Sequence, residues 1–433
     1  MKTMTIMTRV THEPPTHGFV FGKHNGSYVV KPEDRDGHIL VVGGVGRGKS
    51  TCIAMPTLRA WKSPVFAIDI KGELFTYANK YRTRMKVFNP QDKSSNAYGY
   101  DPYAFLRCSN NPAQEARAIA GAIIPLPPDT KDPFWIENAQ TLLTGAILHY
   151  HAMGYSFIDT LQEVQESGVV TLVSVLSNSD NRKARLCVGG FADMIDGSGN
   201  PNKTLAGIFA EVSKGIISLV LDDDIVSALS RDNTITPDDL EYGYDIFLNI
   251  PEHLLRQWKN LLSLMVNQFL LFFERREERQ GLPQILFLLD EFPRLGKIPF
   301  MIDALATLRS KKITICLILQ SLAQLDMIYG KNERKVIADT CGYKAVLSAT
   351  DPETQDYFSK LVGTYDKVKT STGVSKKPLF GTATSKSENT STEDRRIIKP
   401  EEFATLDDMV LLHPLSAPGF VRVERVPWFM VRG

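Results

Sequence analysis

Apolar runs of strand length occur in two separate parts of the chain, with polar or helix-like stretches between them. The runs are residues 38–42, 64–69, 86–90, 244–250, 284–290, 313–319 and 344–349. Such runs are typical of buried strands, and strands that alternate with helices are typical of parallel βαβ units. We therefore predict an α/β fold with a mainly parallel sheet, built from residues 1–108 and 233–433.

The stretch from residue 109 to 232 has a different pattern. Its apolar residues recur at helical spacing without a β-branched run between them, which predicts an all-α domain inserted into the α/β core. Residues 370–394 are rich in Ser, Thr and Lys and poor in large apolar side chains, which predicts a flexible loop. Near the start, two short apolar runs predict a small hairpin across residues 23–26.

Composition and charge narrow the class of protein. A chain of 433 residues exceeds the usual size of one core, which agrees with two domains. The net charge of +1 gives no general attraction to nucleic acid, so a DNA contact would need local basic surface. The five cysteines lack a C-x-x-C pair, which favours a reducing cytoplasm over a zinc site. Residues 1–16 lack the apolar core of a signal peptide, and the longest uncharged apolar-rich run, 260–273, is too short to cross a bilayer.

The sequence GGVGRGKS at residues 43–50 fits the phosphate-loop pattern G-x-x-x-x-G-K-[ST], between a strand-like run and a helix-like stretch. In such a loop backbone N–H groups surround a phosphate, the lysine reaches the β- and γ-phosphates, and the next hydroxyl holds Mg²⁺. The alternative is a glycine-rich turn before an ordinary helix. We expect ATP and Mg²⁺ as ligands, with Lys49 catalytic and Ser50 on the metal. The expected nucleotide-binding residues are Gly43, Gly44, Val45, Gly46, Arg47, Gly48, Lys49, Ser50 and Thr51.

A second candidate motif is the apolar run 285–289 followed by Asp290 and Glu291. Buried strands of α/β sheets end at the ligand crevice, where an aspartate can hold Mg²⁺ and a following glutamate can orient the attacking water. We expect Asp290 to be a metal ligand and Glu291 the catalytic base, as in a Walker B motif. A strand that ends in an exposed acidic turn is the alternative.

Three further positions have open alternatives. Gln320 follows the apolar run 313–319 and is expected to sense the γ-phosphate, although a polar residue at a helix start is also consistent. Arg309 closes a predicted helix at 300–310, where it is either an arginine finger or a solvent-facing residue stabilised by the helix dipole; Arg294 is the reserve candidate. The charged residues of segment 69–73 would bind Mg²⁺ water, the nucleotide or one another.

Several segments in order resemble the coupling ATPases of type IV secretion, the TraG/TraD-like conjugation proteins. Segment 69–74 is similar to the family's D-P-K-G-E-L motif with Ile70 in place of the proline, and 286–296 (LFLLDEFPRLG) is close to its Walker B block. The other segments that carry the resemblance are 43–50 with 56–58, 132–143, 320–330 and 395–403.

The resemblance implies a RecA-like P-loop ATPase core with an all-α domain, working as a homohexamer around DNA. It implies ATP-driven recruitment of relaxase-bound single-stranded DNA and its transfer to the secretion channel proteins, and it supports the finger role of Arg309. Family members usually begin with transmembrane helices, which this sequence lacks. We therefore expect a cytoplasmic protein. The alternatives are a soluble member of the family that docks on a membrane partner, peripheral at the inner face of the cell membrane, and a chain without its anchor.

Two other functions compete with this interpretation. An FtsK-like translocase would act on double-stranded DNA, and strand-specific stimulation of ATP hydrolysis separates it from a coupling protein. A receptor or adaptor for protein substrates would use nucleotide as an assembly switch. The Asp290–Glu291 pair disfavours the switch, because a water-activating carboxylate is needed for hydrolysis and not for binding.

Overall fold

The computed structural model describes residues 9–11, 13–278, 281–376, 384–413 and 419–430. Its centre is a nine-stranded sheet with the order β14-β13-β10-β4-β9-β8-β5-β7-β6. The strands from β10 to β6 are parallel, and β13 and β14 extend the sheet with antiparallel pairing. The strand bounds are β4 (Ile39–Val42), β5 (Val65–Asp69), β6 (Met85–Phe88), β7 (Asp245–Asn249), β8 (Ile285–Leu289), β9 (Ile313–Leu319), β10 (Tyr343–Val346), β13 (Met409–Leu412) and β14 (Phe420–Val423). The predicted α/β class and mainly parallel sheet are confirmed.

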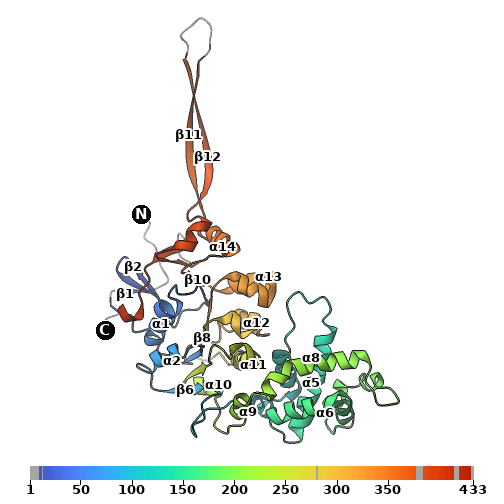
Figure 1. Ribbon diagram of the computed structural model, residues 1–433. Coiled ribbons are helices and arrows are strands. Elements are labelled where there is room, and N and C mark those ends of the chain that lie inside the picture. The colour runs from blue at the N-terminus through green and yellow to red at the C-terminus, as the bar shows by residue number, and fades with distance from the viewer. Residues whose placement is uncertain (1–8, 12, 279–280, 377–383, 414–418, 431–433) are drawn as a thin grey trace.

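Helices cover both faces of this sheet, which explains why its strands are apolar throughout. One face packs against α1 (Met55–Ala60) and α2 (Glu73–Ala78), and the other against α11 (Leu255–Glu274), α12 (Met301–Thr307) and α13 (Leu322–Thr340). Figure 1 shows these two groups on opposite sides of the strands. Successive residues of β4 alternate between the two cores, because side chains of a strand point to opposite faces.

The named elements between Ala104 and Glu241 are helices, as the sequence predicts. They are α3 (Ala104–Cys108), α4 (Pro112–Ile123), α5 (Phe134–Ala152), α6 (Phe157–Ser177), α7 (Arg182–Cys187), a 3-10 turn at Ala192–Met194, α8 (Lys203–Val220), α9 (Asp223–Leu229) and α10 (Pro237–Glu241). A kink divides α6 into two helical segments at Gly168, whose φ of 67° and ψ of 169° are not helical. The inserted helical region is confirmed, and the boundaries at 109 and 232 stay predictions.

A small sheet of β1 (Arg9–Thr11), β3 (Ser27–Lys31) and β2 (Phe19–His24) packs beside the main one. It contains the hairpin expected across residues 23–26. Asn25 and Gly26 both have positive φ, 50° and 78°. A two-residue type I′ turn, whose twist matches that of the flanking strands, requires positive φ at both positions.

The expectation of a flexible loop at 370–394 is wrong for its described residues. After α14 (Pro352–Val362) the chain forms β11 (Thr364–Lys376) and β12 (Thr384–Arg396), an antiparallel pair of 13 residues each. The turn between them lies outside the described residues. Figure 1 shows this hairpin projecting away from the sheet. A strand of 13 residues is roughly 40 Å long at about 3.3 Å per residue. Residues 364–370 and 390–394, at the base of the ribbon, are exposed, so this part of the pairing imposes no apolar period that a sequence pattern could reveal.

Among the described residues, no single helix is both long and apolar enough to span a bilayer. One pair, α8 with α9, meets the test by length and composition when taken together, and the two helices are bent by 83°.

Candidate functional site

The phosphate-loop residues connect β4 to the helix that follows it. The backbone N–H of Gly43 donates to Leu319 O at 3.1 Å, which attaches the start of the loop to β9. Gly46 and Gly48 have φ of 71° and 90°, the left-handed region that glycine adopts without strain. A Cβ on Gly48 would lie 2.8 Å from Cys52 Sγ, so a larger residue does not fit there. The helix starts with a π-helical turn, Lys49–Ala54, and continues as α1.

The Lys49 side chain folds back over the loop. Its Nζ donates to Gly43 O at 2.7 Å and to Gly44 O at 3.2 Å. Burial lowers the pKa of Lys49, while the nearby Glu291 and Asp290 carboxylates act in the opposite direction. The ammonium group is therefore a buried cation that two carbonyl oxygens hold at the loop, where phosphate oxygens would be stronger acceptors.

Asp290 and Glu291 follow directly after β8. The Asp290 side chain faces the cavity, but loss of hydration from the surrounding protein raises its pKa to about 6, and Glu291 adds to the shift. Its Oδ1 accepts the Glu291 backbone N–H at 3.0 Å. Glu291 has φ 49°, a left-handed conformation that costs energy for a residue with a side chain. This turn directs the chain into a short 3-10 helix, η3 (Phe292–Leu295).

These two motifs meet at one cavity of about 300 Å³. Its walls come from the phosphate loop, the end of β5, the segment after β7, the Asp290–Glu291 turn and Gln320. The lining residues expected from the sequence are Val45, Gly46, Arg47, Gly48, Lys49, Ser50, Thr51, Asp290, Glu291 and Gln320. The structure thus brings Lys49, Asp290 and Glu291 together around one crevice, while their chemical roles stay predictions.

Gly43 and Gly44 support the loop from behind rather than lining the cavity. The carbonyl oxygens of both accept the Lys49 ammonium group, and the N–H of Gly44 donates to Ser348 Oγ at 3.0 Å. Asp69 does line the cavity, but its Oδ2 accepts the Phe75 N–H at 2.8 Å, so it also fixes the start of α2. Burial raises the pKa of Asp69.

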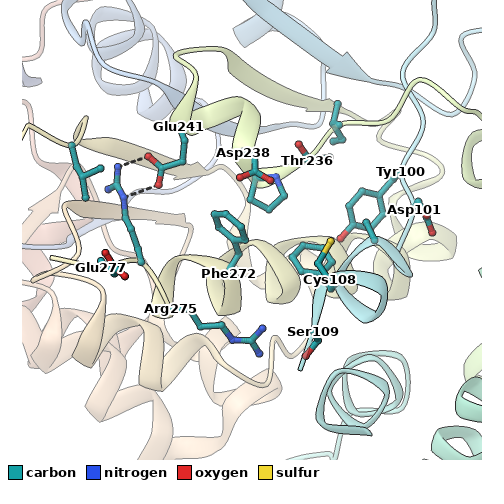
Figure 2. Close-up of a pocket in the computed structure, with 16 residues that line it drawn as sticks. Tyr100, Asp101, Cys108, Ser109, Thr236, Asp238, Glu241, Phe272, Arg275 and Glu277 are labelled. Atoms are coloured by element: carbon teal, nitrogen blue, oxygen red, sulfur yellow. Dashed lines mark hydrogen bonds and ion pairs between the residues drawn. The ribbon is translucent and has the colours of Figure 1, made fainter. Parts of the chain in front are cut away.

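A larger cavity of about 680 Å³ lies where the helical region joins the sheet. Figure 2 shows Asp238 and Glu241 of α10, Phe272 and Arg275 near the end of α11, and Cys108 at the end of α3 around it. Arg276 and Glu241 form an ion pair at 2.7 Å in its wall. No glycine-rich loop is among its described lining residues. Because phosphate recognition needs backbone donors and a fixed cation, the smaller cavity is the nucleotide-site candidate.

Comparison with known proteins agrees with the motifs. A family model described as "Type IV secretory system Conjugative DNA transfer" matches residues 1–430. This chain belongs to that family. The resemblance to conjugative coupling proteins seen in the sequence is therefore confirmed.

Relatives in this conjugative transfer family are longer than the chain. It is 27% identical to the protein VirD4 of Agrobacterium fabrum over 409 residues, which covers 90% of this chain and 59% of that protein. It is 26% identical to a conjugal transfer protein TraG of Escherichia coli over 396 residues, covering 81% and 61% of the two chains. The chain thus spans about three-fifths of the length of these relatives.

Solved structures show the same fold at low identity. The bacterial conjugative coupling protein TrwBdeltaN70 has a TM-score of 0.74 and 18% identity, covering 99% of this chain and 90% of that chain. The plasmid coupling protein TrwB solved with ADP and Mg²⁺ has a TM-score of 0.74 and 18% identity, covering 97% and 90%. This chain and TrwB thus share the architecture of a nine-stranded sheet with an inserted helical region.

Arg309 lies away from the phosphate-loop cavity. It follows the end of α12 and precedes β9, whereas Gln320 follows β9. At about 3.3 Å per residue the seven-residue strand β9 separates them by roughly 20 Å. Arg309 therefore lies at the amino ends of the parallel strands, on the side of the sheet opposite the cavity. Burial is the main cause that lowers the pKa of His38, just before β4, and the positive charge of Arg309 adds to this shift. An arginine-finger role would therefore require the nucleotide of a neighbouring subunit.

Several contacts at the loop escaped sequence reasoning. Arg425, in the C-terminal tail, donates to Leu347 O at 3.0 Å, to Asp408 O at 3.2 Å and to Arg47 O at 3.5 Å. Arg47 in turn donates to Ala404 O at 3.4 Å. These contacts tie the phosphate loop to residues more than 300 positions later, and an isolated arginine gives no motif by which to find them.

Proposed function

We propose that this chain is an Mg·ATP-hydrolysing motor that recruits relaxase-bound DNA and drives its transfer to a type IV secretion channel. The observation that carries the proposal is the convergence of Lys49 with Asp290 and Glu291 around one crevice. Support also comes from the family description, from relatives named as conjugal transfer proteins, and from TrwB structures with ADP and Mg²⁺ and with an ATP analogue.

The loop would bind the phosphates through its backbone. Residues 45–51 line the cavity, and the glycine conformations leave room for the backbone to approach an anion. Lys49 would exchange its carbonyl partners at Gly43 and Gly44 for β- and γ-phosphate oxygens. No covalent intermediate is needed, because phosphoryl transfer depends mainly on positioning and charge stabilisation.

A divalent cation fits the acidic end of this cavity. Burial raises the pKa of Asp290, which means that its charged form lacks sufficient stabilisation from the protein alone. Ser50 and Asp290 are the side chains that would hold Mg²⁺, together with phosphate oxygens and water. When bound, Mg²⁺ would neutralise charge that develops on the transferred phosphoryl group.

Glu291 is the side chain that would orient and deprotonate the attacking water. Its carboxylate accepts the Gln320 amide at 3.1 Å, so the base and the expected sensor are already in contact. A γ-phosphate in the cavity would compete for that amide, and its departure would return Gln320 to Glu291. Gln320 leads into α13, so this exchange is a route from hydrolysis to movement of a helix.

Assembly and location form part of the same proposal. The chain would work as a homohexamer with single-stranded DNA in its central channel, an assembly in which Arg309 would reach the nucleotide of a neighbouring subunit. It would act in the cytoplasm, peripheral at the inner face of the cell membrane, with a relaxase and secretion channel proteins as partners.

The decisive experiment measures ATP hydrolysis against protein concentration with no DNA, single-stranded DNA or double-stranded DNA at fixed salt. A coupling motor should show steep concentration dependence and stronger stimulation by single strands. Stronger stimulation by double strands would favour an FtsK-like translocase. Nucleotide binding without DNA-stimulated hydrolysis would reject the motor and favour a nucleotide-switched adaptor for protein substrates.

A further inference from the structure

An ion pair lies at the mouth of the proposed nucleotide site. Arg294 Nη1 and Glu252 Oε1 are 2.8 Å apart, and Nη2 also donates to the Glu252 carbonyl at 3.5 Å. Both residues line the same cavity as the phosphate loop. Their side chains are 36% and 56% exposed, so a ligand in the cavity can reach them.

Two strand ends place this pair at the carboxyl edge of the sheet. Glu252 follows β7, where the Ile250 N–H donates to Asp69 O at 3.0 Å. Arg294 belongs to η3, whose direction depends on the left-handed turn at Glu291. The Arg294 N–H donates to the Glu291 carbonyl at 2.8 Å, so the position of the arginine is fixed by the turn that carries the proposed base.

Charge around the cavity favours a change of partner for Arg294. Lys49 is buried at the back of the loop, whereas Arg294 is at the rim. A triphosphate carries several negative charges and offers a guanidinium group bidentate acceptors, whereas Glu252 carries one charge. A partly exposed ion pair stabilises a fold little, so stability alone gives a weak reason for this contact.

We propose that Arg294 recognises the γ-phosphate of the nucleotide bound by its own subunit, and that Glu252 holds the guanidinium group until the nucleotide arrives. This rests on the proposed nucleotide-binding function of the cavity. The two arginines would then act on different nucleotides. Arg294 would contact the nucleotide of its own subunit, and Arg309, at the other end of the strands, would contact that of a neighbour. Glu252 then disfavours triphosphate binding, because it competes for Arg294.

The test breaks the pair from each side with matched substitutions, Arg294→Gln and Glu252→Gln. Equilibrium affinities for a non-hydrolysable ATP analogue and for ADP are measured at a dilution where sedimentation shows a monomer. Arg294→Gln should weaken binding of the analogue about tenfold or more while changing ADP affinity little, whereas Glu252→Gln should not weaken it. Arg294→Lys should restore part of the loss, and Arg256→Gln, at an exposed position outside the described lining, should match the wild type.

The outcomes separate this inference from the function on which it rests. Equal weakening by Arg294→Gln and Glu252→Gln would mean that the ion pair has a structural role, and would overturn the proposal. A loss that appears only in the assembled protein would assign Arg294 to a neighbouring subunit, which also overturns it. Failure of the wild-type protein to bind either nucleotide would reject the proposed function itself.

Discussion

Gln320 donates its side-chain amide to the Glu291 carboxylate, with Nε2 3.1 Å from Oε2 and 3.4 Å from Oε1. The two residues follow β9 and β8, which are neighbouring parallel strands with Leu317 opposite Leu289. The contact links the proposed base to the residue expected to sense the γ-phosphate. In the proposed mechanism a bound γ-phosphate would compete with Glu291 for the Gln320 amide.

Replacement of Glu291 by glutamine should keep nucleotide binding and slow hydrolysis by about 10²–10⁴-fold. The amide retains the shape of the side chain but cannot accept the proton of the attacking water. Turnover and retention of radiolabelled ATP on the same sample provide the measurement. Normal hydrolysis would assign the base to another residue.

Removal of the amide in Gln320→Ala should reduce turnover by about tenfold, since one hydrogen bond to a charged group is lost. The double variant Gln320→Ala with Glu291→Gln should be no slower than Glu291→Gln alone, because the two residues act as a unit. Steady-state rates of the three variants test this. Multiplicative losses would show that Gln320 acts independently of the base.

Truncation of the buried lysine in Lys49→Ala should lower ATP affinity by about 100-fold and abolish measurable turnover. The cause is loss of the ammonium group that two loop carbonyls now hold. Calorimetric binding gives the affinity, and a thermal melt on the same variant controls for folding. Undiminished turnover in a folded variant would discard the site assignment.

Loss of the opposite-edge arginine in Arg309→Ala should slow hydrolysis by about 10³–10⁵-fold in the assembled protein. Mixed assemblies are informative, because a neighbour must supply the finger. Arg309→Ala subunits should recover turnover when they are mixed with Lys49→Ala subunits. The Lys49→Ala subunits cannot hydrolyse ATP themselves, but they retain Arg309 and can supply it to the intact site of a neighbour. Absence of recovery in assemblies shown to be mixed would contradict action between subunits.

Acid stability should depend on His38. Burial, and then the charge of Lys31, lower its pKa from about 6.5 to about 4, while its Nδ1 accepts the Ile315 N–H at 3.0 Å. The unfolded state binds the proton first, so this contribution is complete above pH 6.5 and is lost as the pH falls from 6.5 to 4, by up to about 3 kcal/mol. In His38→Asn, which keeps an acceptor, denaturant melts across this range should show a shallower decline. An identical decline would exclude His38 as its source.

Local sequence was sufficient to predict the elements that are expected to carry the chemistry. The phosphate loop, the Asp290–Glu291 turn and the position of Gln320 at a strand end each depend on a few adjacent residues, and the structure places all of them at one cavity. The apolar runs were also sufficient to predict a mainly parallel sheet, because a strand covered on both faces must be apolar along its length.

Tertiary structure decided which strands became neighbours, since pairing of parallel strands joins segments far apart in the chain and leaves no local signal. That order brings Gln320 to Glu291, places Arg309 at the far edge, and brings Arg425 behind the phosphate loop. It also revealed β11 and β12, a ribbon whose backbone hydrogen bonds require no apolar pattern. Contacts between distant segments depend on packing of the whole sheet, and the sequence by itself specified only the parts.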